Sequence, residues 1–115
     1  MHEMGIADSV LEAVRHESGL RSGAHVVKVG LRIGELAAVD PESLRFCFEA
    51  LVSGTDLDPL ALEIEICPRR YRCPLCEEFF RGGEFPVACP KCGSGEVKAA
   101  GGDELEFAFM EIEET

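Results

Sequence analysis

The sequence predicts an α+β fold, in which a small three-stranded sheet carries two helices and a separate module is inserted before the last strand. Three observations support this. Helical and strand periodicities alternate over residues 1–66, residues 67–101 are poor in aliphatic side chains but rich in Cys, Pro, Gly and Arg, and a strand pattern returns over residues 102–115. We therefore expect residues 1–66 and 102–115 to form one α/β domain and residues 67–101 to form another.

The N-terminal segment has the apolar spacing of an amphipathic helix over residues 5–18, with Gly19 as its expected stop. The apolar positions of this helix are Ile6, Val10, Leu11, Ala13 and Val14. The following segment alternates apolar and polar residues, which predicts a half-buried strand. Its apolar positions are Val27, Val29, Leu31 and Ile33.

A second helix is predicted to begin at Asp40-Pro41-Glu42, because Asp is a favoured N-cap, Pro suits the first helical position and Glu suits the first turn. One face of this helix carries Leu44, Cys47, Phe48 and Leu51. Residues 61–66 alternate again and predict a second strand. A strand–helix–strand crossover of this length favours a parallel pair of strands. We expect both helices on one face of the sheet, where they would close a small core.

Residues 105–112 predict a third strand that returns to the first sheet. Leu105, Phe107 and Phe109 alternate, and then Met110 and Ile112 shift the phase, which is typical of a β-bulge. If this strand joins the first two, the cysteine-rich segment is an insertion between two strands of one domain.

The inserted segment contains two Cys-x-x-Cys pairs, CPLC at Cys73 and Cys76 and CPKC at Cys89 and Cys92, separated by twelve residues. Each pair lets a tight turn direct two sulfurs at one point, and two pairs supply the four thiolates that structural zinc prefers. A closed four-thiolate site has no open coordination position, so its role is structural. Binding of the metal would supply folding free energy that this apolar-poor segment lacks. The segment is therefore predicted to be a zinc-ribbon module.

Other roles for the cysteines were weighed. Iron is the serious rival to zinc, because CPxCG knuckles also build rubredoxin-type sites. Disulfides are disfavoured by a reducing compartment, and a thioredoxin-like redox motif is disfavoured because two pairs occur without a surrounding helix signature. Cys47 lies on the apolar face of the second predicted helix and is expected to be a core residue. Cys67 is expected to have a packing role at the entrance to the module, although it could also be a spare ligand.

The composition restricts the partners that we expect. The net charge is −11, and the acidic excess lies outside residues 67–101, which are only mildly basic. A nucleic-acid-binding protein is expected to present a basic face, so we expect no nucleic-acid partner. No apolar run reaches the length of a membrane span, and the N-terminus lacks the basic region of a secretory signal. We therefore expect a cytoplasmic protein with no membrane partner.

The chain begins Met1-His2-Glu3. A terminal amine, the first backbone amides and an imidazole can form fused chelate rings around one ion, and nitrogen-rich sites of this kind suit Ni(II) or Cu(II). The alternative is chance, because chain ends tolerate almost any residue. A zinc-protease helix motif is excluded, since no second histidine follows His2 at the required spacing. No nucleophile–base pair, phosphate loop or open catalytic metal triad occurs either, so we do not expect an enzyme.

Four stretches taken together, MHEMGIADSV, VGLRIGEL, CPLC…CPKCGS and GDELEFAFMEIE, resemble the HypA/HybF family in the family's order. These proteins are nickel metallochaperones for [NiFe]-hydrogenase maturation. The resemblance implies a nickel-binding α/β domain and a zinc-ribbon domain. It implies that His2 is a nickel ligand, that Met1 supplies its amine, and that Glu3 lies within the chelating stretch. It also implies that Asp40 neighbours the site, a role compatible with an N-cap.

The same resemblance implies that Cys73, Cys76, Cys89 and Cys92 hold zinc, while Ni(II) is a transferable cargo. It implies delivery together with a HypB-type maturation GTPase into the [NiFe]-hydrogenase large subunit. The alternative function is a zinc-ribbon adaptor for protein interactions, or a weak nucleic-acid binder, without metal transfer. His2 separates the two, because only a nickel carrier needs it.

Overall fold

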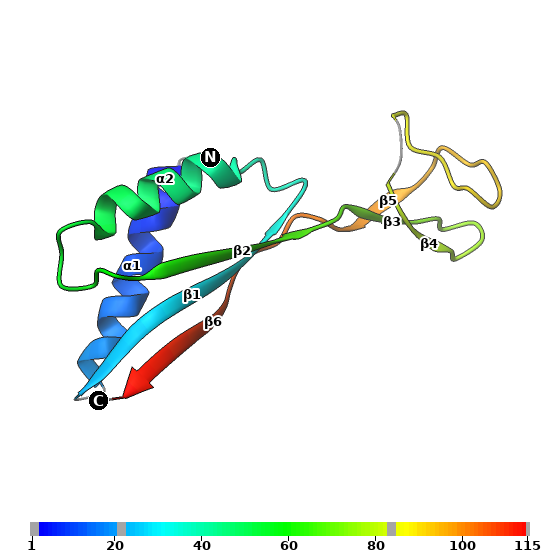
Figure 1. Cartoon of the computed structure of the whole chain (residues 1–115). Coiled ribbons are helices and arrows are strands. Elements are labelled where there is room, and N and C mark those ends of the chain that lie inside the picture. Colours follow the sequence, from blue (N-terminus) through cyan, green and yellow to red (C-terminus); the bar gives the residue numbers. More distant parts are fainter. Residues whose placement is uncertain (1–2, 21–22, 83–84, 115) are drawn as a thin grey trace. The chain divides into compact units, whose positions relative to one another are not determined.

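The computed structural model describes residues 3–20, 23–82 and 85–114. Its elements follow in the order α1 (Glu3–Leu20), β1 (Ala24–Gly34), α2 (Pro41–Val52), β2 (Ala61–Cys67), β3 (Arg70–Arg72), β4 (Phe79–Arg81), β5 (Lys98–Gly101) and β6 (Leu105–Glu114) (Figure 1). They belong to two compact units. The first takes its described residues from the ranges 1–32, 38–65 and 106–115, and the second from 33–37 and 66–105. Residues 33–37, 66 and 102–105, which we expected in the α/β domain, thus cluster with the second unit.

The predicted α+β class is confirmed, with two helices and a three-stranded sheet followed by a second small sheet. The helix α1 is longer than expected, running from Glu3 to Leu20, so that Gly19 lies inside it rather than ending it. Gly19 is exposed and costs a helix only about 1 kcal/mol relative to Ala, which does not stop an otherwise favourable segment. The predicted face was also partly wrong, because Ala7 is buried and Ala13 is exposed.

The first residues of α2 behave as the sequence predicts. Asp40 is the N-cap, with extended backbone angles (φ −84°, ψ 112°), and Pro41 opens the helix. The Asp40 Oδ1 atom accepts from the backbone N–H of Glu42 at 3.0 Å and of Ser43 at 3.5 Å, while Oδ2 accepts from the Ser43 hydroxyl at 3.0 Å. These bonds satisfy donors that the first helical turn cannot satisfy internally.

The larger sheet has the strand order β2-β1-β6, so that β1 lies in the centre. The strands β1 and β2 run in the same direction and β6 runs in the opposite one (Figure 1). Two ion pairs made by Arg32 of β1 agree with this order: its Nε lies 2.8 Å from Glu65 of β2, and its Nη1 lies 3.1 Å from Glu106 of β6. Lys28 lies 4.0 Å from Glu111, further along β6. These pairs are exposed to solvent, so they add little to the stability of the sheet.

The core of the first unit lies where α1 and α2 pack over the sheet. Its buried apolar side chains are Ala7, Val10, Leu11 and Val14 of α1, Val26, Val29 and Leu31 of β1, Leu44, Phe48 and Val52 of α2, and Leu62 of β2. On β1, Gly30 has no side chain because the Phe109 ring of β6 occupies the space that a Cβ atom would fill. None of the described helices is both long and apolar enough to span a membrane.

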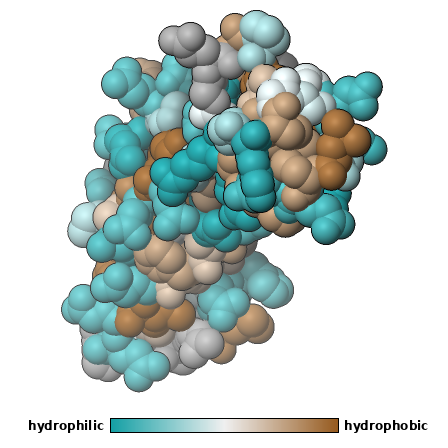
Figure 2. Space-filling view, turned by 90° about the vertical axis from the view of Figure 1, so that its right-hand side faces the viewer, coloured by the Kyte–Doolittle hydropathy of each residue, from teal (hydrophilic) through white to brown (hydrophobic). Residues whose placement is uncertain are grey.

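The second unit contains a small antiparallel sheet of order β4-β3-β5. Tyr71 of β3 lies opposite Phe80 of β4, and their rings stack with centroids 5.9 Å apart. Other large apolar side chains of this unit reach the surface, namely Leu75, Phe79 and Phe85. The space-filling view shows apolar side chains at the surface between hydrophilic ones (Figure 2). The second unit therefore has little apolar core of its own.

Candidate metal centres

The two Cys-x-x-Cys segments form matching turns in the second unit. In the first, the N–H of Cys73 donates to the carbonyl oxygen of Glu78 at 2.9 Å, and the N–H of Glu77 donates to that of Cys73 at 2.8 Å. The second turn has the same two hydrogen bonds: the N–H of Cys89 donates to the carbonyl oxygen of Ser94, and the N–H of Gly93 donates to the carbonyl oxygen of Cys89.

The residue after each second cysteine has a left-handed backbone, which is strained for any residue except Gly. Gly93, with φ of 76°, fits this requirement. Glu77, with φ of 58°, meets it in the other turn at an energetic cost.

The four thiols of these turns meet at one point. All four Sγ atoms lie within 4.8 Å of one another, and the pairs Cys73–Cys92 and Cys76–Cys89 are 3.6 and 3.4 Å apart. A tetrahedral zinc ion with bonds of ~2.3 Å to sulfur requires sulfurs about 3.8 Å apart. The four cysteines of this cluster form no disulfide with one another. The donor set and its spacing therefore fit one tetrahedral ion after small adjustments.

Hydrogen bonds and mutual repulsion divide these thiols into two classes. The pKa of Cys89 is lowered to about 7 and that of Cys73 is lowered too, chiefly because backbone N–H groups of Cys92 and Cys76, respectively, donate to the sulfurs. For Cys76 and Cys92 a backbone N–H also lowers the pKa, but the neighbouring sulfurs and burial outweigh it, and the pKa of Cys76 rises to about 12. The cluster therefore does not ionise fully without a cation, whereas a divalent ion would stabilise all four thiolates.

The two remaining cysteines lie outside this cluster. Cys67 is buried, as a packing role requires, and it is not among the four clustered thiols. Cys47 lies on α2 but is only partly buried, so the expectation of a fully buried core residue was too strong. A salt bridge of 3.8 Å between Lys91 and Glu78 links the two turns, and spacing alone gave no signal for it.

The predicted nickel site begins at the N-terminus. Met1 and His2, the first two residues that we assigned to it, lie outside the described residues. Glu3 is the first residue of α1, and its Oε2 atom accepts a hydrogen bond of 3.3 Å from the backbone N–H of Asp40. The structure therefore brings Glu3 and Asp40 together, although they are far apart in the sequence.

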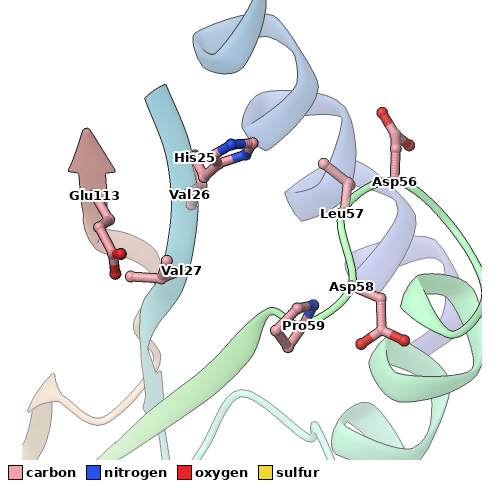
Figure 3. Close-up of a pocket in the computed structure, with 8 residues that line it drawn as sticks. All are labelled: His25, Val26, Val27, Asp56, Leu57, Asp58, Pro59 and Glu113. Atoms are coloured by element: carbon pink, nitrogen blue, oxygen red, sulfur yellow. The ribbon is translucent and has the colours of Figure 1, made fainter. Parts of the chain in front are cut away.

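An open cavity of about 400 Å³ lies in the first unit, between the start of β1 and the loop that precedes β2 (Figure 3). Apolar Val26 and Leu57 line it together with four ionisable side chains, those of His25, Asp56, Asp58 and Glu113. The ionisable groups point in different directions (Figure 3). Among the described residues, the four cysteines are the one cluster with metal-ligand spacing. Sequence spacing could not reveal this cavity, because three distant segments line it.

Comparison with known proteins identifies relatives of this chain. Residues 1–112 match the family described as "Hydrogenase/urease nickel incorporation, metallochaperone, hypA". Hydrogenase maturation factor HypA of Dechloromonas aromatica is 41% identical over 113 residues, which are 98% of this chain and 100% of that protein. The protein of the same name from Azotobacter chroococcum is 39% identical over 113 residues, again 98% and 100% of the two chains.

Solved structures agree with the fold. The solution structure of the Ni metallochaperone HypA from Helicobacter pylori has a TM-score of 0.61 at 23% identity, and the match covers 96% of this chain and 97% of that one. At this identity the likeness concerns the fold alone. The matched family and the relatives show that the chain belongs to the HypA family of hydrogenase/urease nickel-incorporation metallochaperones.

Proposed function

We propose that this protein binds Ni(II) at its N-terminus and delivers it during [NiFe]-hydrogenase maturation, while a separate zinc ion holds its second unit together. Membership of a nickel-incorporation family is the observation that carries this proposal. The proposed nickel ligands are the Met1 amine, the His2 imidazole and the backbone nitrogens of this stretch. The proposed zinc ligands are Cys73, Cys76, Cys89 and Cys92.

The start of α1 supports the nickel proposal. Glu3 is the first described residue of α1, and the first backbone N–H groups of a helix have no intrahelical acceptor. We propose that an amide nitrogen of this stretch loses its proton and binds the metal. The carboxylate of Glu3 is already engaged by the N–H of Asp40. We assign Glu3 a backbone contribution to the chelate and a side chain that anchors this end of α1 beside the start of α2. Asp40, whose carboxylate caps α2, takes a supporting role.

A carrier must take its cargo and release it again. A site at a chain end, with one imidazole and no enclosing cage, exchanges its ion more readily than a closed four-thiolate site. This contrast supports nickel as the cargo and zinc as the structural ion. The expected recipients are the [NiFe]-hydrogenase large subunit and a HypB-type maturation GTPase. We expect neither nucleic acid nor a membrane as partner, and we expect the protein to act in the cytoplasm.

The experiment compares His2→Ala with His16→Ala, a matched control on the exposed side of α1. Untagged protein is titrated with Ni(II) by calorimetry, and zinc is measured by elemental analysis. We expect His2→Ala to lose nickel binding and hydrogenase activation while it keeps zinc, and His16→Ala to behave as the native protein. One-to-one nickel binding of unchanged affinity by His2→Ala would overturn the proposed N-terminal nickel site. Iron in place of zinc would overturn the second part.

A further inference from the structure

The strand β6 forms an open edge of the larger sheet. It is ten residues long, Leu105–Glu114, and in the order β2-β1-β6 one side of it has no neighbouring strand among the described residues. Alternate residues of an edge strand direct their N–H and C=O groups away from the sheet, so about five residues of β6 can bond to an added strand.

The protection of this edge against strand addition depends on charge of one sign. Natural edge strands are kept short, or carry charged side chains or Pro, to prevent pairing with other chains. The sequence of β6, LEFAFMEIEE, is ten residues long, has neither Lys nor Pro, and contains only glutamates as charged residues. Phe107 and Phe109 are 39% and 40% exposed, and the Phe109 ring lies over Gly30 of β1, so apolar surface remains on the face of the sheet formed by β1 and β6. Such an edge favours the addition of an extended segment from another chain.

The charge of β6 indicates the chemistry of that segment. The strand contains four glutamates and no basic residue. Glu106 and Glu111 face Arg32 and Lys28 of β1, whereas Glu113 and Glu114 are exposed near the end of the strand. A second copy of this chain would place glutamates against glutamates, and like charges on paired strands are destabilising. A segment with Lys or Arg would be attracted instead.

We propose that β6 is a docking edge, onto which an extended segment of a partner protein adds as a fourth strand, with Lys or Arg alternating with apolar residues. Backbone hydrogen bonds to β6 would give most of the affinity, contact with Phe107 and Phe109 would add apolar burial, and Glu113 and Glu114 would select a basic partner. The residues of this edge are not among the proposed nickel and zinc ligands, and the proposal needs neither metal.

The test uses the full-length protein and a short capped peptide in which Lys alternates with Val and Thr. A matched peptide carries Glu in place of Lys. Amide hydrogen exchange and chemical shifts locate the contact, and calorimetry measures affinity. The charge-reversal variant Glu113→Lys/Glu114→Lys is compared with Asp8→Lys/Glu12→Lys, which makes the same change in net charge on the exposed side of α1.

We expect the Lys peptide to slow exchange of β6 amides and the Glu peptide to leave them unchanged. The charge reversal on β6 should lower the affinity for the Lys peptide about tenfold or more, whereas the reversal on α1 should have a much smaller effect. Added salt should lower the affinity of the native protein for this peptide. Shifts that map to another surface, or equal binding of the two peptides, would overturn the proposal. Protection of β6 that rises with protein concentration alone would overturn the choice of partner in favour of a second copy.

Discussion

Zinc binding to the four-cysteine cluster should release protons. Cys76 and Cys92 have raised pKa values and are protonated without metal, so each loses one proton when zinc binds. Cys89, with a pKa of about 7, is roughly one-quarter protonated near pH ~7.5. The pKa of Cys73 is lowered too, so its thiol contributes less than those of Cys76 and Cys92. We therefore expect at least about two protons per zinc at this pH, and a larger number as the pH falls below the pKa of Cys89.

The apparent affinity for zinc should depend on pH. A proton competes with zinc for the same sulfur, so the apparent zinc affinity must fall as the pH falls. The affinity should drop by at least about two decades per pH unit near neutrality, because each released proton contributes one decade. Calorimetric titration of metal-free protein in buffers of different ionisation enthalpy measures the proton count directly, and a competing chelator measures the affinity.

The variant Cys92→Ser sharpens this measurement, because it removes one thiol that is protonated before zinc binds. The proton count should fall by about one, with weaker zinc binding. A count below one, or a count that stays constant from about pH 6 to about pH 8, would refute the reasoning from hydrogen bonds and neighbouring sulfurs.

Four other predictions concern the fold and the nickel site. Phe48→Ala should lower the free energy of unfolding, measured in urea, by about 3–5 kcal/mol, because Phe48 is 1% exposed. Phe46→Ala, at a position that is 72% exposed, should change it by less than ~0.5 kcal/mol. Equal effects of the two substitutions would contradict the assignment of Phe48 to the core. Asp40→Ala should cost about 1 kcal/mol in the same assay through loss of the α2 cap, and an unchanged midpoint would count against that cap. Glu77→Gly should stabilise the second unit by about 0.5–1 kcal/mol, which would be measured as slower hydrogen exchange of its amides. Glu77→Ala keeps the strained backbone and should not stabilise the unit. A variant Glu77→Ala more stable than Glu77→Gly would disprove backbone strain at this turn. Nickel affinity should weaken below about pH 6.5 and be lost on N-terminal acetylation, because protons or the acetyl group occupy the ligand nitrogens; a flat profile would point to other ligands.

Features with local causes could be predicted from the sequence. The cap at Asp40 depends on three consecutive residues, and the convergence of four thiols depends on two short turns, so spacing alone located both. The end of α1 could not be predicted as well, because Gly19 weakens a helix without ending it. The exposure of alanines on α1 was also misjudged, since a methyl side chain carries little information about which face is buried.

Features that depend on distant segments were not available from the sequence. The hydrogen bond between Glu3 and Asp40 joins α1 to the start of α2, and no local pattern announces it. The clustering of residues 33–37 with the second unit likewise depends on the folded chain. The alternation in residues 105–109 predicted a strand, but it could not show that Phe107 and Phe109 would stay about 40% exposed at a sheet edge.

The chain order of the larger sheet has a consequence for biosynthesis. Its strands β2 and β1 are complete once about the first 67 residues have left the ribosome, but β6 is the final element to be made. Every residue of the cysteine module must therefore emerge before the sheet can acquire its third strand. On the proposal that the four cysteines bind zinc, a nascent chain completes that site while the sheet is still two-stranded, and a chain truncated within the module would leave the central strand β1 with one bare side.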